Sequence, residues 1–277
     1  MPEIHRILKP LAEEACCVYI TTGPRDARSG QPTKLILEDG DANEYNIDSV
    51  VINKRFQPLI LIESKYIRYK KHNRDKASWI CTAHTKLRQR YSSVRKSIAI
   101  LMGSWSRPSK RLLSSFEVEL FEISFDSICD ALAEFGVNYR WAEKDRAQAE
   151  ASWSKFNALS SAERRQVGRK LIAGIRESLR ESLKNALDES IPREVRSVTV
   201  IVRSNRGETR SFSFDTLKKA IAFLDSTGEE QLIDVSTAPA LSRESHMKKR
   251  ILKEASGSYT TQSAFEFDAP TQAEDEL

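Results

Sequence analysis

A run of apolar residues that leads directly into an acid and a lysine is the strongest constraint in this sequence. Residues 59–62 read Leu-Ile-Leu-Ile, and Glu63-Ser64-Lys65 follow at once, the one acid-x-Lys spacing in the chain. A short apolar run of this kind is typical of a strand buried in a sheet. Because residues i and i+2 of a strand share a face, we expect Glu63 and Lys65 to project to the same side.

A second strand is predicted just before this one, over residues 45–52, with a short polar turn at 53–57. If the turn is centred between Arg55 and Phe56, Asp48 lies directly across from Glu63. Cross-strand neighbours have Cβ atoms about 4.5–5.5 Å apart. A register slip of one residue would move Asp48 to the other face. The hairpin therefore predicts two carboxylates side by side.

Two adjacent carboxylates repel each other, and a divalent cation would offset this repulsion. Mg²⁺ (or Mn²⁺) prefers hard oxygen ligands, typically one or two carboxylates. We expect Asp48 and Glu63 to bind the cation, with the Ser64 carbonyl as a third oxygen. Lys65 would then orient or deprotonate a water, or stabilise charge on a phosphate. The pattern predicts metal-assisted phosphodiester hydrolysis; the alternative is a surface salt bridge between Glu63 and Lys65, with Asp48 as a solvated acid.

The charge of the chain is concentrated in one segment. Residues 52–112 hold sixteen Lys and Arg against two acids, whereas the net charge of the whole chain is +5. So few acids favour a phosphate-bearing partner over a solvated face that pairs its own charges. We expect six of these bases to contact nucleic acid: Arg68, Lys70, Lys71, Lys86, Arg88 and Arg90. Tyr66, Tyr69 and Trp79 lie among them and could stack on nucleotides, although packing is favoured for Trp79.

Several classes of protein are disfavoured by the sequence. No apolar run reaches the length of a membrane span, and the N-terminus shows no secretory signal. The four cysteines lack metal-ligand spacing, which favours a reduced, cytoplasmic setting. His84 lies on the apolar stripe of a predicted helix and is interpreted as a core residue. No P-loop occurs, so any motor would be a separate protein.

The first 140 residues are predicted to form an α/β domain with a mixed central sheet flanked by helices. We expect helices at 4–20, 74–91 and 126–135, and a loop at 22–33. Strands are expected at 34–37, 45–52, 58–69, 97–103 and 116–124. This alternation of element types is typical of a layered α/β unit.

The rest of the chain divides into three segments. Residues 141–192 form a charged helical region, which is either a partner interface or a subdomain packed on the core. Residues 193–238 form a small α+β module with a hairpin (195–203 and 208–214), a helix from 215 to 224 that Asp215 could cap, and a further strand at 231–235. Residues 239–277 are expected to be a mobile, acidic-ended tail.

The order helix, strand, Asp-bearing strand, Glu-x-Lys strand, helix, strand resembles the PD-(D/E)xK restriction-endonuclease-like superfamily. The resemblance covers roughly residues 3–125. Asp48 matches the first acid of the motif, Glu63 the second and Lys65 the lysine, while Ile47 stands where the family often has proline. Many members carry a further glutamate on the N-terminal helix, a place that Glu14 or Glu13 could take as a metal ligand.

The resemblance implies a metal-dependent DNA endonuclease, often dimeric, in restriction, phage defence or mobile-element processing. A homodimer, or a partner protein that supplies specificity or a motor, would complete it. The alternatives are a non-catalytic nucleic-acid-binding protein that retains the fold, and an RNA nuclease. The intact set of Asp48, Glu63 and Lys65 favours the enzyme, because a binding protein has no need to keep all three.

Overall fold

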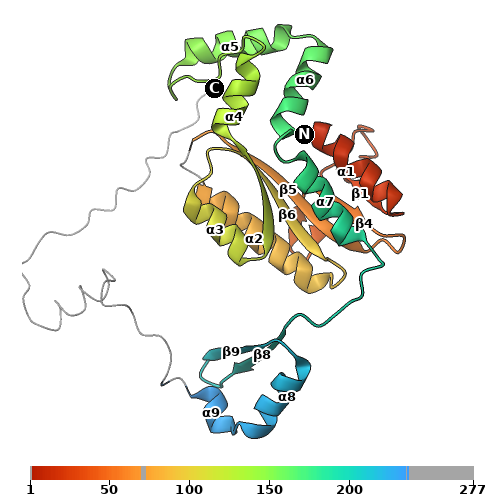
Figure 1. Cartoon of the computed structure of the whole chain (residues 1–277), viewed down its shortest axis with the longest axis vertical. Coiled ribbons are helices and arrows are strands. Elements are labelled where there is room, and N and C mark those ends of the chain that lie inside the picture. Colours follow the sequence, from red (N-terminus) through yellow and green to blue (C-terminus); the bar gives the residue numbers. More distant parts are fainter. Residues whose placement is uncertain (1, 70–72, 235, 237–277) are drawn as a thin grey trace, which may run out of the picture. The chain divides into compact units, whose positions relative to one another are not determined.

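The computed structural model describes residues 2–69, 73–234 and 236 (Figure 1). The contacts divide the chain into two compact units, Met1–Pro192 and Arg193–Leu277. The first unit is an α/β domain in which helices flank a five-stranded mixed sheet, so the predicted fold class is confirmed.

The first unit contains seven helices and seven strands among its described residues. The helices are α1 (Pro2–Glu14), α2 (Asn73–Arg90), α3 (Arg107–Ser115), α4 (Phe125–Ala133), α5 (Arg146–Ala158), α6 (Ser161–Ile172) and α7 (Arg176–Leu187). The strands are β1 (Val18–Ile20), β2 (Ile36–Glu38), β3 (Glu44–Asn46), β4 (Ser49–Ile52), β5 (Pro58–Ile67), β6 (Lys96–Gly103) and β7 (Val118–Ser124).

The main sheet has the strand order β1-β4-β5-β6-β7, and β2 and β3 form a separate hairpin. Strand β4 runs antiparallel to both of its neighbours, β1 and β5, whereas β5, β6 and β7 run parallel to one another. Ser49 pairs with Ile62 and Val51 with Ile60, before the register shifts at Ile52. This register continues to place Asp48 opposite Glu63, as predicted. The predicted turn centre was wrong: Ile52 pairs with Pro58, so the turn is centred on Arg55, and the irregularity between Val51 and Ile52 shifts the strands into the predicted pairing.

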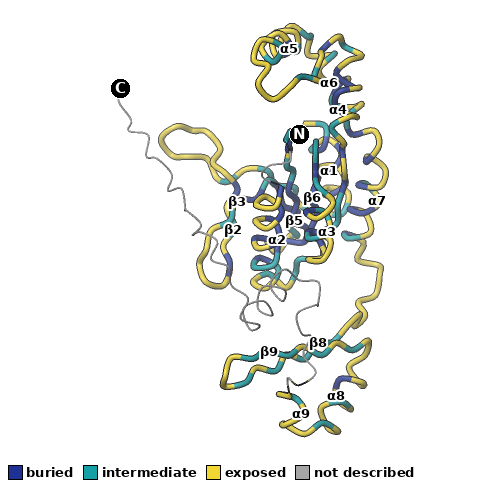
Figure 2. Tube along the Cα trace, turned by 90° about the vertical axis from the view of Figure 1, so that its left-hand side faces the viewer, coloured by how far each residue is buried: buried dark blue, intermediate teal, exposed yellow. Residues whose placement is uncertain are grey.

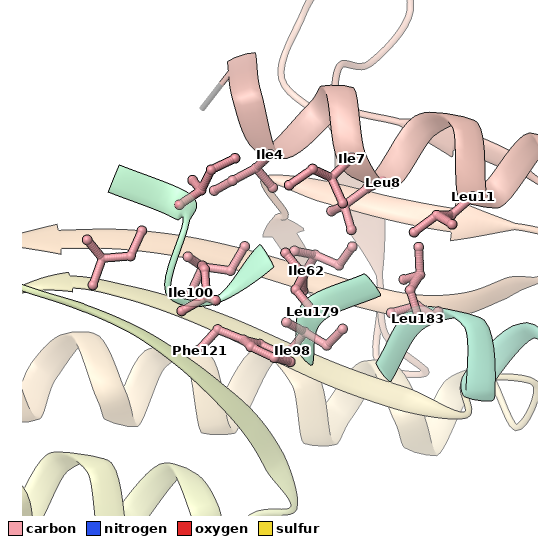
Figure 3. Packing of buried hydrophobic residues seen from close by; sticks show 14 of the residues in the cluster. Ile4, Ile7, Leu8, Leu11, Ile62, Ile98, Ile100, Phe121, Leu179 and Leu183 are labelled. Carbon is pink, nitrogen blue, oxygen red and sulfur yellow. The ribbon is translucent and has the colours of Figure 1, made fainter. Parts of the chain in front are cut away.

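The two faces of the sheet are covered by different helices, and alternation along β5 decides which side chain meets which. On one face, Ile60 and Ile62 join the apolar cluster formed with α1, α4, α6 and α7. Figure 3 shows Ile4, Ile7, Leu8 and Leu11 of α1 above this face, with Leu179 and Leu183 of α7 beside them. On the other face, α2 and α3 pack on Ile67 and Leu101. Glu63 and Lys65 alternate with Ile62, so they belong to the α2 side.

Residues 141–192 complete this core. Val167, Ile172, Leu179 and Leu183 are buried in the same cluster as α1. Helices α6 and α7 therefore pack on the core, which is one of the two interpretations given for the charged helical region. Figure 2 shows that the buried positions concentrate in β5 and β6 and on the inner sides of the helices around them.

Two further local predictions in the first unit were wrong, and one helix was missed. The helix predicted for 4–20 ends at Glu14: Cys16 has a positive φ of 54°, and Val18–Ile20 pair with β4, because tertiary strand pairing outweighs helical spacing there. The strand predicted for 45–52 is divided into β3 and β4, which pair with different partners. Helix α3 had not been predicted; the Ser106 side chain caps it by accepting a hydrogen bond from the Ser109 N–H.

The second unit contains an antiparallel hairpin of β8 (Val198–Arg203) and β9 (Thr209–Phe214), followed by α8 (Leu217–Ser226) and α9 (Glu229–Ile233). The hairpin and first helix were predicted, but Thr216 rather than Asp215 caps α8. The strand predicted at 231–235 was wrong, because residues up to Ile233 are helical. The predicted tail, 239–277, lies outside the described residues.

Candidate active site

Asp48 and Glu63 are held side by side at the point where β4 begins. The Asp48 N–H donates a hydrogen bond to Glu63 Oε1 at 3.3 Å. The Ser64 N–H donates to Asp48 Oδ2 at 2.8 Å. Backbone groups of two neighbouring strands therefore orient both carboxylates, so little side-chain freedom is left to lose when a ligand binds.

Lys65 brings its ammonium group between the two acids. Its Nζ lies 3.2 Å from Asp48 Oδ2 and 2.5 Å from Glu63 Oε2. The exposed fractions of the three side chains are 0% for Glu63, 25% for Lys65 and 39% for Asp48. The structure thus brings together the three residues predicted from sequence. Because the Glu63 side chain is fully buried, its contact with Lys65 is not a surface salt bridge.

The electrostatics of this group follow from burial. Burial raises the pKa of Glu63 to about 8, against the opposing attraction of Lys65, and the charge of Asp48 acts in the same direction as burial. Burial alone would lower the pKa of Lys65, but the Glu63 and Asp48 carboxylates outweigh it and raise that pKa. A positive charge beside Glu63, such as the Lys65 ammonium, therefore favours the ionised form of this acid against its burial.

The position of the Lys65 ammonium group indicates whether a divalent cation could bind between Asp48 and Glu63. One cationic centre already contacts an oxygen of each carboxylate, and hard carboxylate oxygens are the ligands that Mg²⁺ and Mn²⁺ prefer. A strand residue presents its N–H and C=O to the same edge, so the Ser64 carbonyl lies on the edge where its N–H meets Asp48. Within the described residues no group of three or more His, Cys, Asp and Glu side chains gathers. The donor set is thus two carboxylates with one backbone carbonyl, which fits a magnesium site completed by water and phosphate.

Two cavities open on either side of Asp48. The larger, of about 570 Å³, also contains Lys65 and is lined by Lys34, Lys76 and Trp79 among others. The smaller, of about 350 Å³, is lined by polar residues that include His5, Tyr19, Ser49 and Ser64. Asp48 thus lines both cavities.

The smaller cavity contains residues that the sequence did not single out. The His5 Nδ1 and the Tyr19 hydroxyl are 2.7 Å apart. Burial raises the pKa of Tyr19 to about 12, so its hydroxyl keeps its proton at neutral pH. Neither residue belongs to a recognisable sequence motif, because only the packing of α1 and β1 in the folded protein places them near Asp48.

Glu14, the further ligand suggested by the resemblance, does not line either cavity. The α1 residue that approaches Asp48 is His5. Glu14 is nine residues further along this helix, about 13 Å at 1.5 Å per residue, and it is exposed. We therefore leave Glu14 out of the candidate ligand set.

Arg68, predicted to contact nucleic acid, is instead enclosed by aromatic rings. Its guanidinium lies 3.9 Å from the ring centroid of Trp141 and 4.4 Å from that of Tyr139. It also donates hydrogen bonds to the carbonyl oxygens of the same two residues and to the Tyr69 hydroxyl. Arg68 therefore ties the end of β5 to the chain that follows α4.

The other predicted contact residues that the structure describes do not line the cavity that contains Asp48 and Lys65. Lys86 pairs with Asp41 at 3.1 Å, and Arg88 pairs with Glu117 at 2.7 Å. Arg90 is exposed in the last turn of α2. Lys86 is ten residues beyond Lys76, about 15 Å along the helix, so the C-terminal half of α2 does not line the cavity. Lys70 and Lys71 lie outside the described residues.

Comparison with known proteins adds little to this geometry. No protein family matches the chain, and no curated protein matches it. The chain is similar to a crystal structure of a protein of unknown function, AF1548, with a TM-score of 0.30 and 12% sequence identity over 67% of this chain and 95% of that one. No helix in the described part of the chain is both long and apolar enough to cross a lipid bilayer.

Proposed function

We propose that this protein is a metal-dependent nuclease that hydrolyses phosphodiester bonds of DNA. One observation carries the proposal: the carboxylates of Asp48 and Glu63, on neighbouring strands, both lie within ion-pair distance of Lys65 Nζ. The resemblance to PD-(D/E)xK nucleases also supports the proposal, because Asp48 directly precedes β4 and the Glu-x-Lys strand β5 is followed by α2 and β6, although β1, β2 and β3 stand between α1 and β4.

In this proposal Asp48 and Glu63 hold Mg²⁺ or Mn²⁺, with the Ser64 carbonyl beside them. A divalent cation bound there supplies a Lewis acid that offsets the charge of a phosphate. Lys65 has its Nζ where it can hold or accept a proton next to the carboxylates. Asp48 is the most exposed of the three and faces both cavities, so a phosphate would approach from its side.

The buried position of Glu63 favours an enzyme over a protein that only binds nucleic acid. A fully buried carboxylate costs free energy unless it is paired and hydrogen-bonded. Phosphate binding alone requires positive charge, which surface lysines supply without any buried acid. Retaining Glu63 at the end of an apolar strand is explained by a role in binding a cation.

The proposed cellular location of this nuclease is the cytoplasm. Cys16, Cys17, Cys81 and Cys129 are all free thiols, which supports a reduced, cytoplasmic environment. Restriction, phage defence and mobile-element processing are the settings that the resemblance suggests, with a second copy of the chain or a separate protein supplying specificity.

The test is cleavage of supercoiled and linear DNA in Mg²⁺, Mn²⁺ or EDTA. We expect metal-dependent nicking by the unaltered protein and its loss in Asp48→Ala and Lys65→Ala. Glu122→Gln is a matched control, because Glu122 on β7 of this sheet also pairs with a lysine, Lys110 of α3, at 2.6 Å, but lies outside the two cavities. DNA binding without cleavage, in every metal, would instead support a protein that only binds.

A further inference from the structure

The larger cavity beside Asp48 contains an aromatic ring that the proposed hydrolysis does not require. Trp79 lines this cavity together with Asp48 and Lys65, and 38% of the residue is exposed. Packing had been favoured for this residue from sequence. Trp105 packs in this way, with 9% exposure inside the cluster under α3. The Trp79 ring is therefore available to a ligand.

The ring lies close to the candidate chemistry. Lys65 Nζ is 5.4 Å from the centroid of the Trp79 ring, and the same ammonium contacts Asp48 and Glu63. A group stacked on Trp79 would thus be next to whatever is bound at the carboxylates. This separation suits two neighbouring parts of one molecule, such as a base and the adjacent phosphate.

Two further lysines make the cavity suitable for an anion. Lys34 and Lys76 line it, both are exposed, and among the described residues neither has an ion-pair partner. Lys76 precedes Trp79 by three residues on α2, so the two side chains lie on the same side of the helix. Unpaired cations beside an exposed indole combine the two features by which proteins bind unpaired nucleotides, namely charge along the backbone and stacking of the base.

The size and shape of the cavity decide between paired and unpaired nucleic acid. A volume of about 570 Å³ is in the range of pockets that enclose a small ligand, and a double helix cannot enter it. Inside a duplex, both faces of a base are covered by its neighbours, so away from the duplex ends an indole can stack only on a base that has left the helix or was never paired.

We propose that Trp79, Lys34 and Lys76 form a subsite for an unpaired nucleotide next to the bond that is cleaved. The substrate class is then nucleic acid with a single-stranded stretch, such as a free strand, a flap or a frayed end. The position of cleavage relative to this nucleotide rests on the proposed function, whereas binding of the nucleotide does not.

The experiment is a titration followed by tryptophan fluorescence in EDTA, so that no cleavage is needed. The probes are twelve-nucleotide single-stranded DNA, the same sequence as RNA, and a relaxed, covalently closed circular duplex DNA, which has no ends. The chain has four tryptophans, and Trp153→Phe is a matched control because Trp153 is exposed on α5, outside the cavity. We expect single strands to quench the fluorescence of the unaltered protein and of Trp153→Phe, and we expect little quenching in Trp79→Phe.

Affinity provides the second readout. Trp79→Ala should bind single strands about tenfold more weakly, the typical effect of losing one base–aromatic stack. Trp79→Phe keeps an aromatic face and should retain most of the affinity. Duplex binding should change little in either variant. A preference for DNA or RNA among the single strands identifies the sugar that is recognised.

The outcomes separate the two proposals. Quenching by single strands without metal-dependent cleavage would support the subsite and count against the nuclease. Cleavage of duplex DNA that is unaffected by Trp79→Ala, with no quenching by single strands, would overturn the subsite and leave the nuclease in place. Equal quenching by the relaxed circular duplex would also overturn it, since this duplex has no ends and its bases are covered on both faces.

Discussion

The Asp48 N–H donates to the Glu63 carboxylate, and one residue further along β5 a backbone N–H donates back to Asp48. These bonds continue the β4–β5 hairpin beyond its last ladder pair, Ser49 with Ile62. The main chain thereby orients two acids that would otherwise repel each other. Their proximity is a property of strand register, and substitutions of either acid should affect cation binding more than folding.

Thermal unfolding should report cation binding directly. We expect millimolar Mg²⁺ or Mn²⁺ to raise the Tm of the unaltered protein, because a ligand at 100 times its Kd stabilises the folded state by about 2.7 kcal/mol. For a domain of this size that corresponds to a shift of about 5–10 °C. Asp48→Asn and Glu63→Gln should abolish the shift and Glu122→Gln should preserve it. An equal shift in Asp48→Asn would place the cation elsewhere.

Lys65 should be needed for cleavage but not for cation binding. Lys65→Met removes the amine while both carboxylates remain, so we expect the cleavage rate to fall by about 10²–10⁴-fold, as for loss of a proton-transfer group. The metal-induced rise in Tm should persist. Lys65→Arg restores the charge but cannot release a proton. Single-turnover cleavage assays of both variants check this, and full activity in Lys65→Arg would reduce the role of Lys65 to charge alone.

Arg68 should contribute to stability rather than to nucleic-acid affinity. Arg68→Ala removes its contacts with Tyr139 and Trp141, and we expect a loss of about 2–4 kcal/mol of unfolding free energy in urea denaturation. Arg68→Lys should recover little, because a point charge replaces a planar group.

The salt dependence of DNA binding distinguishes Arg68 from a true phosphate contact. Replacing a lysine that contacts phosphate lowers the slope of log affinity against log salt by about one. We expect this for Lys76→Ala and no change for Arg68→Ala. A reduced slope in Arg68→Ala would return this residue to the nucleic-acid interface.

His84 should make the fold sensitive to acid. It is buried in α2, and neither ring nitrogen has a hydrogen-bond partner. Burial, followed by the charges of Arg88 and Lys65, lowers the pKa of His84 to about 3, while Asp48 acts in the opposite direction. An unfolded histidine has a pKa of about 6.5. Between these values only the unfolded chain binds the proton, so stability should fall as the pH falls.

The variant His84→Leu tests this dependence. It removes the titrating group from the apolar surroundings, so its Tm should exceed that of the unaltered protein at pH 5 by more than at pH 7.5. Thermal melts at both values in EDTA measure the two differences. A difference that does not depend on pH would assign the acid sensitivity to another group.

Much of the candidate site could be predicted from the sequence because its geometry is local. The period of two along β5 places Glu63 and Lys65 on one face. The turn before Pro58 alone would give a different register, and the irregularity between Val51 and Ile52 is what brings Asp48 opposite Glu63. The apolar residues of β6 identify it as a buried central strand in the same way. Strand periodicity involves few residues, so nearby sequence contains enough information to predict it.

The surroundings of the site were decided only by tertiary structure. The sequence did not show that Lys34, Trp79 and Lys76 would line one cavity with Asp48, or that His5 and Tyr19 would line the other. From the sequence, Arg68 was predicted to contact nucleic acid. The rings that surround it, those of Tyr139 and Trp141, come about seventy positions later in the chain, and no local pattern connects them with Arg68. Such contacts depend on how helices pack across the sheet, and packing is set by the whole core. The sequence by itself determined the strand that carries Glu63 and Lys65; the folded structure decided the register shift that sets Asp48 beside them and which other side chains meet them.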